Sequence, residues 1–339
     1  METNPVTQKD RLDKVVAALF IMYCKTGAKN IENIIHCIAS TTFEGHTAIV
    51  NYASGTLYAH IRNNKLFVYH YRLHQPHILL PKSFAKYVPA ATMDLPLIRN
   101  NTQITLNIKL LCSMPNIQKL AVLTNYRIPK ACLRGTAQMF SNLKEMWCDG
   151  QTVLSISVIC AEVKQLTIFG HAGVTNKALK EYWRFPALTA IHVDIGTNFN
   201  FATFAGSVHT ISLLKDIVAS LKWYAKLHDI VLHLMPTPTD LHADIRIYPY
   251  INSFFFHNHS DQCIHVISKH NVFGGTYVNT VQYLCQRGFV QISPKNVRYQ
   301  HIWHNGVPFI HDVQLVMSPT PVVALAPNVV VEENELHNT

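Results

Sequence analysis

The chain has no long apolar run. None of its uninterrupted apolar stretches approaches the roughly 18 residues of a membrane-spanning helix, although 48% of its 339 residues are hydrophobic. The polar segment from Met1 to Lys14 is not followed by the apolar core of a signal peptide, because the stretch from Leu19 to Met22 is short and Lys25 interrupts it. We therefore expect an intracellular protein, cytoplasmic or nuclear, that does not bind a membrane.

Charged residues are few, and acidic residues are the scarcer sign. Charged side chains make up 14% of the chain, with 29 Lys and Arg against 20 Asp and Glu, so the formal net charge is +9 before the 20 histidines are counted. This excess allows contact with anions, nucleic acid included, but no block of five or six Lys or Arg concentrates it. Low charge with high apolar content excludes a disordered chain and predicts a substantial core, in one large domain or two ordinary ones.

Motifs for catalysis are missing as well. There is no G-x-S-x-G, Walker-type loop, H-E-x-x-H or G-x-G-x-x-G, and the eight cysteines form no C-x-x-C pair. We therefore predict a non-enzymatic protein with reduced thiols, no catalytic residues, no cofactor and no bound metal.

One segment keeps a metal site open as an alternative. Several types of transition-metal ligand lie close together there: His257, His259, Asp261, Cys263, His265 and His270. Their spacings differ from the C-x2-C and H-x3-5-H patterns of zinc sites, and histidines are abundant throughout the chain. We interpret the segment as a chance cluster, and a metal-dependent enzyme centred on residues 257–270 is the alternative.

What the chain does contain is a recurring apolar phrase of the type Leu-x-x-Leu-x-Leu. It occurs at Ile117-Leu120-Val122, Leu143-Met146-Cys148, Val163-Leu166-Ile168, Leu188-Ile191-Val193, Val208-Ile211-Leu213, Leu227-Ile230-Leu232 and Ile251-Phe254-Phe256. Successive first positions are 26, 20, 25, 20, 19 and 24 residues apart, which agrees with the period of roughly 20–29 residues of leucine-rich repeats. The segment resembles leucine-rich-repeat proteins of the irregular kind found in F-box substrate receptors, and Asn125 stands at the Asn/Cys position of the family in the first repeat.

The pattern before the repeats predicts helices and then strands. Residues 9–39 carry apolar side chains at helical spacing with a break at Gly27, whereas 48–52, 56–61 and 66–71 are rich in β-branched and aromatic residues. Asn63-Asn64-Lys65 separates the last two strands as a hairpin turn would, because asparagine tolerates positive φ. The helical segment would correspond in position to an F-box, although it has no Leu-Pro phrase.

Strand and helix patterns alternate from there on. Residues 104–108 alternate as a strand that leads into the repeats, short helices are expected near 133–140, 178–183 and 217–224, and 153–159 is expected to be a loop or strand. This alternation predicts an α/β fold, namely an irregular leucine-rich-repeat-like solenoid with parallel strands. The parts are an α+β N-terminal region (1–100), a leucine-rich-repeat-like domain (101–318) and a flexible tail (319–339).

The repeats also predict a concave face. In leucine-rich repeats the leucines point inward, so the strand residues between and after them point to the concave side. These residues are Lys119, Ala121, Leu123, Glu145, Trp147, Asp149, Gln165, Thr167, Phe169, Ala190, His192, Asp194, Thr210, Ser212, Leu214, Asp229, Val231, His233, Ser253, Phe255 and His257. The set holds four carboxylates and one lysine, an acidic lean that disfavours a phosphate backbone. A register error of one residue would place the whole set in the core.

Exposed aromatic residues among polar neighbours are typical of protein-binding hot spots. The predicted partner-binding residues are therefore Trp147, Asp149, Phe169, His192, Asp194, His233, Phe255 and His257. Our first hypothesis is a scaffold that binds a protein partner on this face, as a substrate-receptor type of adaptor if the F-box resemblance extends that far. The second is a basic nucleic-acid-associated or assembly-forming structural protein, for example a virus-encoded one, whose binding would weaken steeply with salt.

Overall fold

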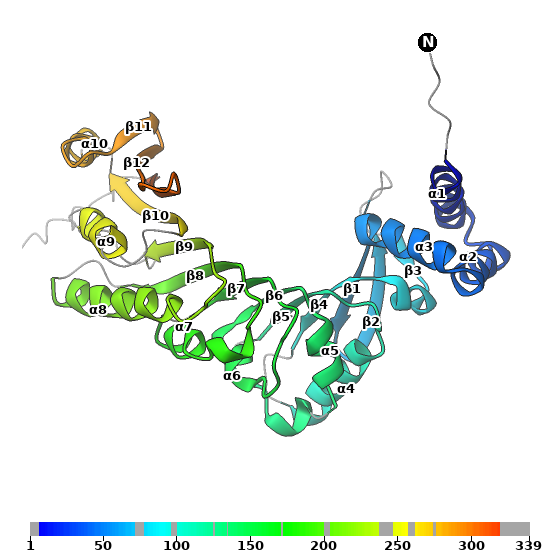
Figure 1. Ribbon diagram of the computed structural model, residues 1–339. Coiled ribbons are helices and arrows are strands. Elements are labelled where there is room, and N and C mark those ends of the chain that lie inside the picture. Colours follow the sequence, from blue (N-terminus) through cyan, green and yellow to red (C-terminus); the bar gives the residue numbers. More distant parts are fainter. Residues whose placement is uncertain are drawn as a thin grey trace, which may run out of the picture.

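The computed structural model describes residues 7–71, 78–95, 100–124, 126–133, 135–170, 172–199, 204–236, 247–256, 262–273 and 276–318. Over these residues the protein is an α/β fold with helices at its N-terminus and one long mixed sheet that is largely parallel (Figure 1). The α/β class is thus confirmed.

The described strands form a single sheet of thirteen. In spatial order they are β11 (Val290–Ser293), β12 (Asn296–Ile302), β13 (Pro308–Ser318), β10 (Cys263–Phe273), β9 (Asp229–Pro236), β8 (Ala190–Phe199), β7 (Gln165–Phe169), β6 (Glu145–Asp149), β5 (Lys119–Leu123), β4 (Ala90–Asp94), β1 (Leu57–Arg62), β2 (Lys65–His70) and β3 (Ile78–Leu80). The pairs from β1–β4 to β10–β13 are parallel. The pairs at both ends of the sheet, β1–β2–β3 and β13–β12–β11, are antiparallel.

Helices follow the strands along the chain and cover one face of the sheet. They are α4 (Asn101–Cys112), α5 (Ala137–Asn142), α6 (Gly150–Ser155), α7 (Ala172–Leu179), α8 (Phe204–Leu221), α9 (Ile247–Phe256) and α10 (Tyr277–Cys285), with 3-10 turns η1 (Lys82–Tyr87), η2 (Lys130–Leu133) and η3 (Tyr182–Arg184). Figure 1 shows α4 to α8 along the outer side of the curved sheet. None of the described helices α4 to α8 lies on the inner side, which we call the concave face.

The N-terminal part begins with α1 (Gln8–Thr26), α2 (Lys29–Thr41) and α3 (Phe43–Thr56). The two helices predicted over residues 9–39 are confirmed, and the chain turns between them at Gly27 with φ of +64°. The predicted hairpin is confirmed too, because Asn63 and Asn64 have φ of +50° and +59° in the turn between β1 and β2.

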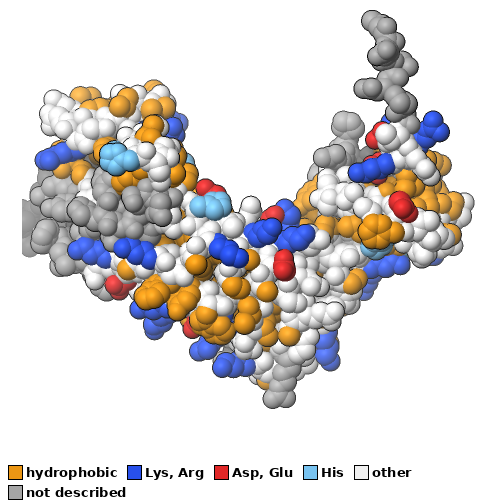
Figure 2. Space-filling model, in the orientation of Figure 1, with side chains coloured by type: hydrophobic (Ala, Val, Ile, Leu, Met, Phe, Trp, Pro, Cys, Tyr) orange, Lys and Arg blue, Asp and Glu red, His pale blue; other side chains and the backbone are white. Residues whose placement is uncertain are grey.

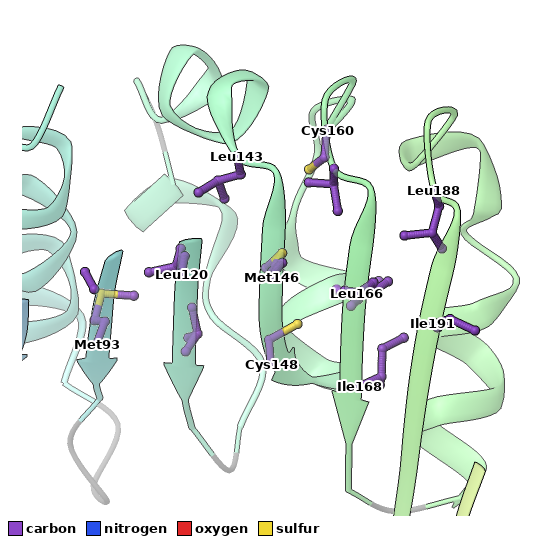
Figure 3. Close-up of a cluster of buried hydrophobic side chains, with 14 of the residues drawn as sticks. Met93, Leu120, Leu143, Met146, Cys148, Cys160, Leu166, Ile168, Leu188 and Ile191 are labelled. Atoms are coloured by element: carbon purple, nitrogen blue, oxygen red, sulfur yellow. The ribbon is translucent and has the colours of Figure 1, made fainter. Parts of the chain in front are cut away.

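The buried side chains of neighbouring parallel strands are aligned in rows. One row contains Leu120, Met146, Leu166, Ile191, Ile230 and Ile264, and the next contains Val122, Cys148, Ile168, Val193, Leu232 and Val266. Figure 3 shows several of these side chains on adjacent strands in one continuous cluster. Each fully buried aliphatic side chain stabilises the fold by about 1.5–3 kcal/mol relative to an exposed one, so these rows fix the strand register.

Five of the predicted apolar phrases lie at strands. Their first residues, Ile117, Leu143, Val163, Leu188 and Leu227, are buried just before β5, β6, β7, β8 and β9. The in-and-out alternation predicted for these strands is confirmed, and with it their register.

Two predicted phrases are wrong. Val208-Ile211-Leu213 lies in α8, where Leu214, Ile217 and Leu221 are buried at helical spacing. Ile251-Phe254-Phe256 lies in α9, and the next parallel strand is β10. A phrase with apolar residues at i and i+3 fits a helix as well as the entry to a strand, and here the helical period continues beyond it.

Three further local predictions are corrected by the structure. Residues 48–52 belong to α3 and 104–108 to α4, since Ile104, Ile108 and Leu111 are buried on one helical face. The segment 153–159, expected as loop or strand, begins inside the short helix α6. In each case burial of one helical stripe outweighs the β-propensity of the branched residues.

The domain boundary predicted near residue 100 stays a prediction, and the predicted tail 319–339 lies outside the described residues. Among the helices that the structure describes, none combines the length and the apolar character needed to cross a bilayer.

Candidate binding face

The concave face carries rows of side chains that are in register across the sheet. His60, Thr92, Ala121, Trp147, Thr167, His192, Val231 and His265 follow one another along one such row, from β1 to β10. Because strand residues alternate between the two faces, these side chains point away from the helices. Much of the predicted face is therefore one surface.

An aromatic pair stands at the middle of this surface. Trp147 on β6 and Phe169 on β7 have their ring centroids 5.1 Å apart at an angle of 48°. Trp147 keeps 45% of its surface exposed although it lies in the centre of the sheet. A large aromatic side chain in this position is held by its neighbour and still free to contact another molecule.

Trp147 forms one wall of a hollow of about 300 Å³. We call it the aromatic hollow; its lining includes Tyr58, Tyr71, Ala90, Thr92, Lys119, Ala121, Glu145, Trp147, Gln165 and Thr167. Small side chains on β4 and β5, such as Thr92 and Ala121, form the floor. Three strand-to-strand steps separate β1 from β6, about 14 Å in total, which leaves room for one segment of polypeptide, since a helix is about 10–12 Å across.

The wall opposite Trp147 is also aromatic. Tyr58 and Tyr71 have centroids 5.4 Å apart, Tyr58 stacks on Tyr69 at 5.9 Å, and Phe67 continues the series. The sequence analysis did not assign these residues to the face. The alternation of Phe67, Tyr69 and Tyr71 along the predicted strand already indicates one aromatic face. Its position near β4 and the hollow depends, however, on the parallel pairing between β1 and β4.

Carboxylates around the hollow are paired. Glu145 Oε1 lies 2.6 Å from Lys119 Nζ, and Asp94 Oδ2 lies 2.8 Å from His60 Nε2. Lys119 therefore offsets the charge of Glu145 in this part of the face, whereas the acidic lean predicted for the face as a whole stays a prediction.

Asp149 has a structural role that the sequence analysis missed. Its Oδ1 accepts a hydrogen bond of 2.7 Å from the Thr152 amide, so it caps the N-terminus of α6. Burial raises the pKa of Asp149, and hydrogen bonds from Thr152 oppose the shift. The side chain is almost completely buried and does not present its carboxylate on the concave face.

A histidine cluster occupies the face further along the sheet. The rings of His192 on β8 and His233 on β9 meet edge to face, with centroids 4.5 Å apart. Burial lowers the pKa of both, and for His233 the charge of His192 adds to the effect, while the nearby Asp194 acts in the opposite direction. The structure thus brings His192, Asp194 and His233 together, as predicted for one face.

The remaining predicted face residues lie elsewhere. Thr210, Ser212 and Leu214 belong to α8, and Ser253 and Phe255 to α9, so their assignment to concave strands is wrong. The side chain of Phe255 is outside the described part of the structure, as are His257 and the other residues of 257–261. Among the described residues, no group of three or more His, Cys, Asp and Glu could hold a metal ion.

One hydrogen-bonded chain has the order nucleophile, base and orienting group. Ser268 Oγ lies 2.8 Å from His311 Nε2, and His311 Nδ1 lies 2.6 Å from Asn252 Oδ1. Nδ1–H donates to Asn252, so Nε2 accepts from the Ser268 hydroxyl. All three side chains are buried on the helix side of the sheet, and burial lowers the pKa of His311 to about 3. The arrangement is a polar network of the core and presents no group to a substrate.

Comparison with known proteins gives no relative: no family model, curated protein or solved structure matches the chain.

Proposed function

We propose that this protein is a non-enzymatic scaffold that binds a protein partner on its concave face, in the manner of leucine-rich-repeat proteins. The arrangement of the sheet supports this proposal. The aligned core residues of successive parallel strands, Ala91, Leu120, Met146, Leu166, Ile191, Ile230 and Ile264, are 29, 26, 20, 25, 39 and 34 residues apart. The first four intervals fall in the leucine-rich-repeat range of roughly 20–29 residues, and longer connections through α8 and α9 account for the last two.

The observation that carries the proposal is the exposure of Trp147 above the aromatic hollow. A tryptophan that is 45% exposed in the centre of a sheet leaves a large apolar area in water. Tryptophan is enriched among hot-spot residues, where removal of one anchor costs about 2 kcal/mol or more of binding energy. The Phe169 contact fixes the ring before binding and so reduces the entropy lost on association.

The substrate-receptor extension of the proposal concerns α1 to α3, which precede the sheet as a ligase-docking segment would. These helices expose apolar side chains that include Val15, Met22, Ile34 and Phe43. No Leu-Pro phrase opens the segment, so the proposal depends on the concave face and not on a ligase.

Affinity capture from a native lysate tests the proposal when it is run on wild type, Trp147→Ala and Trp223→Ala. Trp223 is the matched control because it is 63% exposed in the turn after α8, away from the concave strands. We expect a discrete protein that survives nuclease and moderate salt and is lost with Trp147→Ala alone. Isothermal titration with the identified protein then measures the difference in affinity, and equal capture by both variants would refute the concave-face assignment.

The same experiment addresses the nucleic-acid alternative. Recovery of nucleic acid that is released by salt, in place of a protein, would support a basic nucleic-acid-associated protein, since phosphate contacts release counterions.

A further inference from the structure

Two lysines lie side by side at the edge of the aromatic hollow. The Lys164 amide donates to the Lys144 carbonyl at 2.8 Å, and the Lys144 amide donates to the Gln118 carbonyl at 2.8 Å. Lys144 and Lys164 are thus direct neighbours at the starts of adjacent strands, whose backbones are about 4.8 Å apart. Both side chains are exposed.

These lysines directly precede two residues that line the hollow. Lys144 is followed by Glu145, and Lys164 by Gln165. The carboxylate of Glu145 is taken up by Lys119 on the adjacent strand. Within the part of the chain that the structure describes, neither Lys144 nor Lys164 has a carboxylate within ion-pair distance.

Figure 2 shows that cationic side chains gather at the base of the curve, near β5 to β7. Two like charges on adjacent strands repel each other, and an anion placed between them relieves that repulsion. The edge of the hollow is therefore complementary to negative charge, whereas Trp147, Tyr58 and Tyr71 give it aromatic walls and its floor has small side chains.

We propose that the partner presents an acidic segment to this site, with an apolar or aromatic side chain in the aromatic hollow and carboxylates against Lys144 and Lys164. The proposal rests on the proposed function and specifies its partner. Lys144 and Lys164 lie one and two strands from Ala121 and three residues earlier in register, roughly 11–14 Å from it. An extended chain covers this distance in about three or four residues, at about 3.3 Å each, so the carboxylates lie three or four positions from the anchor.

The charge distribution favours an acidic peptide over a nucleic acid. A protein that binds a nucleic-acid backbone tightly neutralises about 6–10 phosphates, and this edge offers two free lysines. Glu145 and Asp94 interrupt any line of cations across the floor, because Glu145 already occupies Lys119 and Asp94 lies against His60, so the face offers no continuous phosphate track. A short segment with one anchor and two or three carboxylates matches the site in size and in charge.

Selection from a random library of displayed 12-residue peptides tests this inference on the full chain. The targets are wild type, Trp147→Ala, the double variant Lys144→Glu/Lys164→Glu, and the control Lys109→Glu/Lys177→Glu. The control makes the same change in net charge on the outer helices α4 and α7. Circular dichroism establishes that all variants fold.

We expect Trp147-dependent peptides with Asp or Glu about three or four positions from a large apolar residue. Their Kd rises at least tenfold in Lys144→Glu/Lys164→Glu and less than twofold in the control, because only the first pair removes the facing cations. Selection on Lys144→Glu/Lys164→Glu itself enriches Lys and Arg at the same positions.

Other outcomes overturn the inference in distinguishable ways. Trp147-dependent peptides without acidic preference, or an unchanged Kd in Lys144→Glu/Lys164→Glu, would refute the acidic partner and leave the proposed function standing. Absence of any Trp147-dependent peptide would refute both. Binding of a 20-nucleotide oligouridylate that depends on Lys144 and Lys164, with no selected peptide, would assign these lysines to phosphate.

Discussion

Ser268 donates a hydrogen bond of 2.8 Å to Nε2 of His311, and the opposite nitrogen of the same ring lies 2.6 Å from the amide oxygen of Asn252. The bonds join β10, β13 and α9 across the core. His311 pairs with Val266 in the ladder and so extends the buried apolar row that runs from Val122 to Val266. A titratable ring stands here beside apolar side chains, and its burial favours the neutral form.

Stability should therefore fall in mild acid. Burial lowers the pKa of His311 from 6.5 to about 3, so below pH 6.5 the unfolded chain binds a proton that the native state does not. The stability linked to this ring is complete above pH 6.5 and is lost as the pH falls from 6.5 towards 3. At pH 5 the loss is about 2 kcal/mol, measurable by urea denaturation at pH 7 and pH 5.

His311→Leu is the matching variant. It should lose about 1–3 kcal/mol at pH 7, because Ser268 and Asn252 are left without their partner. Its decline between pH 7 and pH 5 should be smaller than that of wild type by about 2 kcal/mol, the remainder coming from groups such as His192 and His233, whose pKa is also lowered. Equal slopes in the two proteins would show that His311 is accessible to protons in the folded state.

Neighbouring residues of β6 should respond in opposite ways to truncation. Met146→Ala empties a buried core position and should destabilise the protein by about 2–5 kcal/mol. Trp147→Ala removes an exposed ring and the Phe169 contact, so the expected loss is about 1 kcal/mol. Thermal unfolding of both variants tests the register, and a larger loss for Trp147→Ala would place the indole in the core.

Asp149 should matter for stability and not for partner binding. Asp149→Ala leaves the Thr152 amide at the start of α6 without its cap and should cost about 0.5–2 kcal/mol, whereas Asp149→Asn retains a capping oxygen and should lose less. Denaturant midpoints of the two variants, measured beside their partner affinity, separate the two roles. Weaker binding by Asp149→Ala at unchanged stability would restore this residue to the binding face.

A bidentate ion pair should anchor the far end of the face. Arg298 Nε and Nη2 donate to the two carboxylate oxygens of Asp312 at 2.7 and 2.9 Å, and His265 contacts the same carboxylate. Burial alone would raise the pKa of Asp312, but these hydrogen bonds outweigh it and hold the pKa below its usual range.

Arg298→Ala leaves a buried carboxylate with one partner and should destabilise the fold by about 1–3 kcal/mol, a range reduced because the arginine is partly exposed. Arg287→Ala, which removes an exposed contact with Tyr283, should change stability by less than about 1 kcal/mol. If chemical denaturation finds the two variants alike, Asp312 is solvated without Arg298.

The parts of the fold that the sequence predicted are those where local pattern and burial agree. At β6, the predicted alternation of Met146, Trp147 and Cys148 agrees with their burial, so local pattern and packing favour the same strand. In α8, the apolar residues from Val208 continue at helical spacing to Leu221, and the phrase that resembles a strand entry is part of that longer stripe. A strand and a helix are distinguished by whether the apolar residues continue at a period of two or of about 3.6 residues. A phrase of six residues is too short to show which period continues.

The residues of the candidate site likewise fall into those that the sequence could place and those that it could not. Trp147 and Phe169 could be placed on one face because β6 and β7 are consecutive parallel strands, so sequence order equals spatial order. Tyr58 and Tyr71 could not, because β1 pairs with β4 across two intervening strands of the chain, and the choice of that partner depends on contacts distant in sequence. The role of Asp149 depends on the backbone direction at the end of β6, which no side-chain pattern encodes.

The rows on the concave face form a grid, with about 4.8 Å between columns and about 6.6 Å between successive outward residues on a strand. Since the outward positions Ala121, Trp147 and Thr167 each have buried neighbours before and after them in the chain, these side chains can be exchanged while the core rows remain intact. Single positions of this surface can therefore be substituted one at a time. Under the proposed function, a small set of substitutions at Ala121, Trp147 and Thr167 is expected to change which partner the face binds without a new fold.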